Sequence, residues 1–201
     1  SRYITPPPVI EIDERFLKYR NAEKLAKELS ILGDFRHFVI VDGSFIFGDF
    51  IEALLVVNNI QAKRIIISTL SMSQNNVDSL ENLLVGGYVE QLDLVVSDYF
   101  YSHEKRMLVP YIYEKLDIGN KFQFAVAGSH CKICLIETIG GNKITIHGSA
   151  NLRSSSNTEQ FTIENSKELF DFNLGIQDKI IEKYKTIKKP LRASKLWNTF
   201  N

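Results

Sequence analysis

The residues from His130 to Glu159, HCKICLIETIGGNKITIHGSANLRSSSNTE, decide how the rest of the chain is interpreted. Gly140-Gly141-Asn142 predicts a tight turn, because glycines readily adopt the positive φ that such turns need. The flanking residues alternate in polarity, so we expect a β-hairpin. Its first strand would carry His130 and Lys132, which are two residues apart and therefore on one face.

The groups at the ends of this hairpin suit the chemistry of a phosphate ester. The second strand ends at Gly148-Ser149-Ala150-Asn151, a turn of small residues that can bring backbone N–H groups, a hydroxyl and a carboxamide close to an anion. The Lys132 ammonium adds a positive charge, and the His130 imidazole can attack phosphorus or transfer a proton. We therefore predict a phosphate-binding, nucleophilic site that includes Gly148.

The pattern H-x-K-x4-E followed by G-S-x-N resembles the signature of the phospholipase D superfamily, and the complete pattern occurs once in the chain. The resemblance implies that His130 is a nucleophile that forms a phosphohistidine. It implies that Lys132 and Asn151 hold the phosphoryl oxygens and that Ser149 adds a hydrogen bond. Glu159 would orient the His130 ring through its other nitrogen.

Glu137 stands where the family usually has Asp. Strand alternation turns its side chain away from His130, so we expect it in a structural network.

The same resemblance, which covers about residues 36–187, implies a fold and an assembly. Strand-like and helix-like segments alternate, which indicates an α/β fold with a mixed, mostly parallel sheet flanked by helices on both faces. The chemistry needs a nucleophile and a general acid, but the signature occurs once. We therefore expect a homodimer with a shared active site, and neither a cofactor nor a metal.

Local patterns predict the individual elements. We expect strands at 36–41, 63–68, 92–97, 122–127 and 160–163, besides the hairpin. We expect helices at 13–32, 48–60, 74–85, 103–116 and 166–187.

The chain divides into three parts. Residues 1–12 predict an extended proline-rich arm, residues 13–187 a single domain of phospholipase D type, and residues 188–201 a basic tail or linker. Residues 183–201 hold six of the 24 basic side chains and no acidic one, so this segment could contact nucleic acid.

Other candidates lie outside the hairpin. Ser44 and Phe45 follow the first strand, at the sheet end where α/β proteins place ligands, and we expect them to contact substrate. His103 lies in an aromatic loop and is a candidate for base stacking. We expect structural roles for His147 and His37.

Composition bounds the class of protein. The chain has 201 residues, equal numbers of acidic and basic side chains, and no apolar run that could span a membrane. No signal peptide is visible, so we expect a cytoplasmic protein that does not contact a membrane. Cys131 and Cys134 point to opposite faces of a strand, which disfavours a disulfide, and we expect both to be buried or half-buried.

The sequence thus predicts a metal-independent phosphodiesterase, a nuclease that hydrolyses DNA. Two alternatives stay open at this point. One is a non-catalytic module that binds phosphate or nucleic acid. The other is the catalytic domain of a larger restriction endonuclease whose specificity domain lies beyond residue 201.

Overall fold

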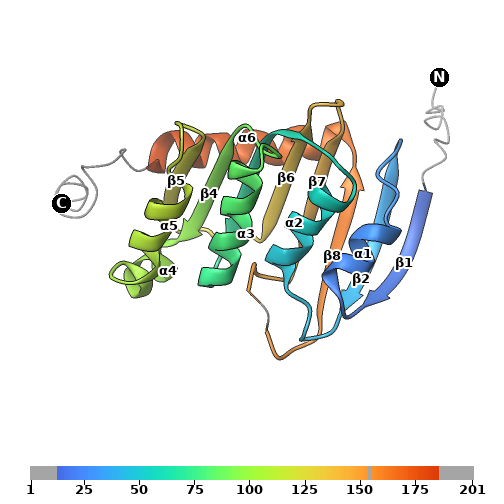
Figure 1. Cartoon of the computed structure of the whole chain (residues 1–201), viewed down its shortest axis with the longest axis horizontal. Coiled ribbons are helices and arrows are strands. Elements are labelled where there is room, and N and C mark those ends of the chain that lie inside the picture. Colours follow the sequence, from blue (N-terminus) through green and yellow to red (C-terminus); the bar gives the residue numbers. More distant parts are fainter. Residues whose placement is uncertain (1–12, 154, 186–201) are drawn as a thin grey trace, which may run out of the picture.

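The computed structural model describes residues 13–153 and 155–185, which form one eight-stranded mixed sheet and six helices (Figure 1). The strands are β1 (Asp13–Tyr19), β2 (Phe35–Val41), β3 (Ala62–Thr69), β4 (Leu92–Ser97), β5 (Phe122–Ala127), β6 (Ile133–Thr138), β7 (Lys143–Gly148) and β8 (Glu159–Asn165). The helices are α1 (Ala22–Glu28), α2 (Phe47–Val57), α3 (Gln74–Val85), α4 (Asp98–Glu104), α5 (Leu108–Leu116) and α6 (Lys167–Tyr184).

The strand order is β1-β2-β8-β7-β6-β3-β4-β5. Only the pairs β1–β2, β3–β4 and β4–β5 are parallel, and the four pairs that involve β6, β7 or β8 are antiparallel. The expectation of a mostly parallel sheet is therefore wrong. The hairpin and β8 are inserted between β2 and β3, and local patterns carry no information about that strand order.

Helices cover both faces of the sheet, as predicted. In Figure 1, α2, α3 and α5 lie in front of the sheet and α6 behind it. The apolar strand residues divide accordingly: Ile65 and Ile67 belong to the larger core cluster beneath the front helices, while Ile66 belongs to a smaller one with Phe170 and Ile181 of α6. Burial on both faces explains why β3 and β4 are nearly continuous apolar runs.

The elements with clear end signals match the prediction most closely. Helix α3 occupies the predicted residues, and its N-cap Ser73 and Asn76 form a reciprocal capping box. Helix α6 begins after the predicted cap Ser166, whose side chain accepts a hydrogen bond from the Leu169 N–H. Strands β4 and β5 also have the predicted bounds.

The predicted helix at 13–32 is wrong. Residues 13–19 form β1, an edge strand that pairs in parallel with β2, and a helix begins only at Ala22. Asn21 caps this helix by accepting a hydrogen bond from the Lys24 N–H, which fixes its start. The spacing of Phe16, Leu17 and Tyr19 fits both a helical and a strand repeat. The segment is a strand because it pairs with β2, which lies further along the chain.

The predicted helix at 103–116 is divided into α4 and α5. Ser97 caps α4 by accepting a hydrogen bond from the Phe100 N–H, so α4 begins before the predicted start. Pro110 lies in the first turn of α5, where its missing N–H would have no helical partner anyway.

Two predicted segments, the arm at 1–12 and the tail at 188–201, lie outside the described residues. Within 13–153 and 155–185, no helix has the length and apolar character needed to cross a membrane.

Candidate active site

The candidate residues gather at one end of the sheet. Strand β6 is antiparallel to β3, with Ile133 opposite Ser68, so the start of β6 lies at the carboxyl end of β3. The ends of β2 and β7 and the start of β8 lie there too, because Val41 pairs with Glu159 and Gly148 with Phe161. This is the end at which open α/β sheets bind ligands.

The segment 128–132 carries His130 and Lys132 across this end of the sheet. It joins β5 to β6, and β4 and β3 lie between these two strands. At about 4.8 Å per strand spacing, three spacings are about 14 Å, a distance that the segment can span even with the turn formed by the hydrogen bond from the Ser129 N–H to the Ala127 carbonyl. His130 therefore lies above the ends of β4 and β3.

His130 and Lys132 precede β6 and are not part of it, so their expected placement on one strand face is wrong. The Lys132 carbonyl accepts a hydrogen bond from the Gly148 N–H at 3.4 Å, which holds this segment beside the G-S-x-N turn. The His130 side chain is exposed, and within the described residues it has no hydrogen bond or ion pair. The expected contact between His130 and Glu159 is not formed in this chain alone.

Glu159 is held by two serines. The Ser149 hydroxyl donates to Glu159 Oε2, and the Ser155 hydroxyl donates to Oε1 at 2.9 Å. The Ser149 oxygen also accepts the Gln160 N–H at 3.1 Å. Ser149 thus joins the G-S-x-N turn to the start of β8, and its proton is directed at Glu159. Ser155 was not predicted; its position four residues before Glu159 was the available signal.

Asn151 is oriented by the end of β3. Its side-chain Oδ1 accepts the Leu70 N–H at 3.1 Å and lies 3.5 Å from the Thr69 hydroxyl. The Leu152 N–H donates to the same hydroxyl at 3.4 Å. With the oxygen occupied, the carboxamide NH₂ is left to donate to a ligand. Thr69 was also not predicted, although it ends an apolar strand at the ligand end of the sheet.

Gly148 allows β7 and β8 to approach closely. A Cβ at this position would lie 2.1 Å from the Gln160 carbonyl oxygen and 2.6 Å from Phe161 Cα. Gly43 has a similar role, since its Cβ would lie 2.7 Å from the Ser155 carbonyl oxygen. Glycines thus let the loop between β7 and β8 pack against the turn after β2.

Of the residues after β2, Ser44 is exposed, and its backbone N–H and hydroxyl donate to Asp42 Oδ1 at 3.0 and 2.8 Å. These bonds, the backbone one foremost, lower the pKa of the Asp42 carboxyl. Phe45 is only 4% exposed and packs against Phe50 and Phe161. Its ring belongs to the core, which corrects the expected contact with substrate.

His103 lies in the last turn of α4, not in a loop. It is exposed, and its ring Nδ1 lies 2.8 Å from the Tyr99 carbonyl oxygen. With Lys105 it forms a second H-x-K triplet, but without the following acid and G-S-x-N. Side chains two apart on a helix point in different directions, so this triplet does not place its two groups together as an extended segment does.

Glu137 lies near the opposite end of β6. It forms an ion pair with Lys143 at 2.7 Å and a longer one with Lys63 at 3.9 Å. The hydrogen bond from Lys143, the largest influence, lowers the pKa of the Glu137 carboxyl. Glu137 therefore stabilises the hairpin at a distance from the candidate site.

Cys131 is exposed and Cys134 is buried, and neither forms a disulfide. The expectation that Cys131 is at least half-buried is wrong, because the chain around it runs outside the sheet. In the part of the chain that the structure describes, no three His, Cys, Asp or Glu side chains are grouped to hold a metal ion.

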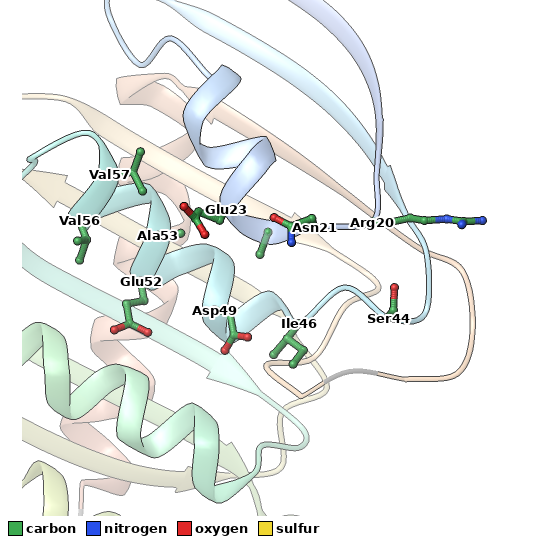
Figure 2. Close-up of a pocket in the computed structure, with 11 residues that line it drawn as sticks. Arg20, Asn21, Glu23, Ser44, Ile46, Asp49, Glu52, Ala53, Val56 and Val57 are labelled. Carbon is green, nitrogen blue, oxygen red and sulfur yellow. The ribbon is translucent and has the colours of Figure 1, made fainter.

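A cleft of about 480 Å³ lies between the start of α1 and the length of α2, and the predicted substrate contact Ser44 is among its lining residues. Figure 2 shows Glu23, Asp49 and Glu52 along this cleft, with the Arg20 side chain directed away from them. Burial, reinforced by the nearby Glu52 charge, raises the pKa of Asp49. The cleft contains none of the predicted catalytic residues, and its acidic lining is unsuited to phosphate.

Fold and site together define an α/β sheet protein with an oxygen- and nitrogen-rich edge built from its β6–β7 hairpin. The chain shares the fold of a phospholipase D family member, Nuc from Salmonella typhimurium: the two are 13% identical, with a TM-score of 0.51, over 64% of this chain and 84% of that one. TrmBL2, an archaeal chromatin protein, is 9% identical with a TM-score of 0.47, over 82% of this chain and 58% of that chain. This second similarity is too weak to inform function. No family model and no curated protein matches the sequence.

Proposed function

We propose that this protein is a metal-independent phosphodiesterase, a nuclease that cleaves DNA through a phosphohistidine. The observation that carries the proposal is the convergence of Lys132, the G-S-x-N turn and the serine-held Glu159 at one end of the sheet, beside His130. The shared fold of the phospholipase D family member Nuc supports the same class of chemistry.

In the proposed mechanism, a nitrogen of His130 attacks phosphorus and the bond to the leaving oxygen breaks. Lys132 and the Asn151 NH₂ donate to the phosphoryl oxygens, on which negative charge accumulates. A second imidazole protonates the leaving oxygen. Water then attacks the phosphohistidine, that second imidazole takes the water's proton, and His130 is released.

The second imidazole is the reason to propose a homodimer. The 128–132 segment is at the surface, and His130 is exposed on it. If two chains meet there about a two-fold axis, the His130 of one chain faces the His130 of the other. Each Glu159 then lies near side chains of the second chain.

The decisive experiment incubates the purified protein with plasmid DNA and a single-stranded oligonucleotide in EDTA, beside His130→Ala. We expect wild-type cleavage to survive EDTA and the variant to be inactive. The covalent intermediate should be visible in the wild type, quenched in alkaline detergent because a phosphohistidine is stable to alkali and labile to acid, as a labelled DNA strand attached to the protein, and it should be absent from His130→Ala. Cleavage that disappears in EDTA and returns with magnesium would reject the mechanism. Binding of DNA without cleavage would favour the non-catalytic alternative.

A further inference from the structure

Helix α4 begins directly beside the segment that carries His130. Ser97, the residue before α4, pairs with Ala127 in the β4–β5 ladder, and the 128–132 segment starts one residue later. That segment then crosses the end of β4, from which α4 emerges. Figure 1 shows α4 beyond this end of the sheet, next to α5. A strand bound at His130 would therefore pass α4 within a few nucleotides.

Helix α4 presents two neighbouring rings to solvent, which are tilted by 36° to one another. Tyr99 is 68% exposed, and its ring centroid lies 4.0 Å from that of His103. The His103 Nδ1 is fixed by the Tyr99 carbonyl at 2.8 Å, and since a carbonyl only accepts, this nitrogen carries the hydrogen. The two rings are thus ordered before any ligand arrives, which reduces the entropy lost on binding.

Basic and apolar side chains continue this surface. Lys105, Arg106 and Met107 follow α4 and are exposed, Met107 at 75%. Arg106 forms no ion pair with any residue in 13–153 or 155–185. The opposite flank of the site is the cleft lined by Glu23, Asp49 and Glu52. The carboxylates of that cleft disfavour a polyanion there, whereas on the α4 side Lys105 and Arg106 offset the carboxylates of Asp98 and Glu104.

We propose that Tyr99 and His103 form a stacking platform for an unpaired base of single-stranded nucleic acid, with Arg106 contacting the adjacent phosphate. The inference rests on the proposed function, because it describes how the substrate approaches the same site. Bases in a duplex are already stacked on both faces, whereas an unpaired base offers a free face to an aromatic ring. The platform therefore selects single strands.

The experiment measures binding by fluorescence anisotropy in the His130→Ala background, so that cleavage does not interfere. Labelled oligo-dT, oligo-U and a DNA duplex are compared at fixed salt. Tyr99→Ala should weaken binding of the single strands about 5- to 150-fold, the range given by loss of one base stack. Tyr99→Phe keeps the ring and should bind as the parent does. Phe172→Ala is the matched control, since Phe172 is also 68% exposed but lies on α6.

Equal weakening for single strands and duplex, or equal effects of Tyr99→Ala and Phe172→Ala, would overturn the platform. Preference for oligo-dT over oligo-U, or the reverse, identifies the natural strand and leaves the platform supported. Bis(p-nitrophenyl) phosphate is too small to reach α4, so its hydrolysis by the wild type tests the proposed chemistry separately. Hydrolysis without Tyr99-dependent binding rejects the platform alone, and Tyr99-dependent binding without hydrolysis supports the platform while rejecting the chemistry.

Discussion

Asn151 shows how one side chain can be prepared for a single donor role. Its oxygen is engaged by the Leu70 N–H, which leaves the NH₂ group for the ligand. Asn151→Asp keeps the size and the oxygen but removes the donor and adds a negative charge. We expect kcat to fall at least 100-fold, equivalent to about 3 kcal/mol of lost transition-state stabilisation. Asn157→Asp, in the same exposed loop, is the charge control and should retain activity. Equal losses in both variants would contradict a specific role.

Cys131 offers a chemical probe of the site because it lies between His130 and Lys132. It is exposed, whereas Cys134 is fully buried and its burial strongly raises the pKa of its thiol. Since the thiolate is the reactive form, we expect one thiol per chain to react with a disulfide reagent in the folded protein and two after unfolding.

A bulky maleimide on Cys131 should abolish cleavage by blocking the approach to His130. Cys131→Ser should be active and resistant to the reagent. Reaction of both thiols without unfolding, or full activity after labelling, would show that this segment is placed differently.

His37 predicts how stability depends on pH. It is fully buried in β2, its ring stacks on Phe35 at 5.0 Å, and neither ring nitrogen has a hydrogen-bond partner among the described residues. Burial is the main cause that lowers its pKa, opposed by Asp13 and reinforced by Arg15. Below pH 6.5 the unfolded chain binds a proton here that the folded chain resists, so stability falls as the pH falls through this range. The free energy of unfolding in urea, measured at pH 7.5 and 5.5, should differ less between the two pH values for His37→Phe than for wild type. An unchanged difference would mean that other groups cause the pH dependence.

At the scale of elements, the sequence determined some segments by local signals alone. Ser73 and Ser166 carry the caps that start α3 and α6, and each is followed by a helical apolar period, so both helices were predictable. The β6–β7 hairpin was predictable from its glycine turn. The identity of β1 was not, because its outer face is exposed and only pairing with β2 makes it a strand.

The same limit applies to the site. The G-S-x-N turn and Glu159 could be located from the sequence, but the support of Asn151 by Thr69 and Leu70 joins residues about eighty positions apart. That contact depends on β6 lying beside β3, which no local pattern encodes. Ser155 lies close to Glu159 in the sequence, but it is one of three consecutive serines, and only the loop geometry shows which of them contacts Glu159.

Gly148 tests the close approach of β7 and β8. Gly148→Ala places a Cβ against the Gln160 carbonyl and the Phe161 backbone, neither of which can rotate away. We expect the free energy of unfolding to fall by about 1–3 kcal/mol, the usual cost of overpacking, with Ser149 and Glu159 displaced and activity lost.

Gly175→Ala is the matched control. Gly175 is exposed in the middle of α6 and has no atom within 4 Å of an added Cβ, so the same substitution should stabilise by about 0.5–1 kcal/mol. Chemical denaturation of both variants makes the comparison. A neutral Gly148→Ala would mean that the two strands are further apart than described.

At the scale of the whole molecule, the proposed sharing of one site by two chains predicts how mixed chains behave. If each site needs His130 from two chains, a dimer of wild type with His130→Ala should be nearly inactive. An equal mixture after exchange should then retain about a quarter of the wild-type activity, the fraction of wild-type homodimer. Sedimentation of the wild type should give twice the chain mass.

A mixture that retains half the activity would show that each chain holds a complete site. The second imidazole would then come from the same chain, and His103 on the neighbouring α4 would be the residue to replace next. A fully active monomer would lead to the same conclusion, that one chain holds a complete site.

The insertion of β8, β7 and β6 between β2 and β3 has a consequence for synthesis on the ribosome. Until β6, β7 and β8 emerge, the chain holds two separate half-sheets, β1–β2 and β3–β4–β5, with unpaired edges where these three strands will later join them. The joining elements also carry the G-S-x-N turn and Glu159. The step that completes the sheet is therefore also the step that assembles the candidate site.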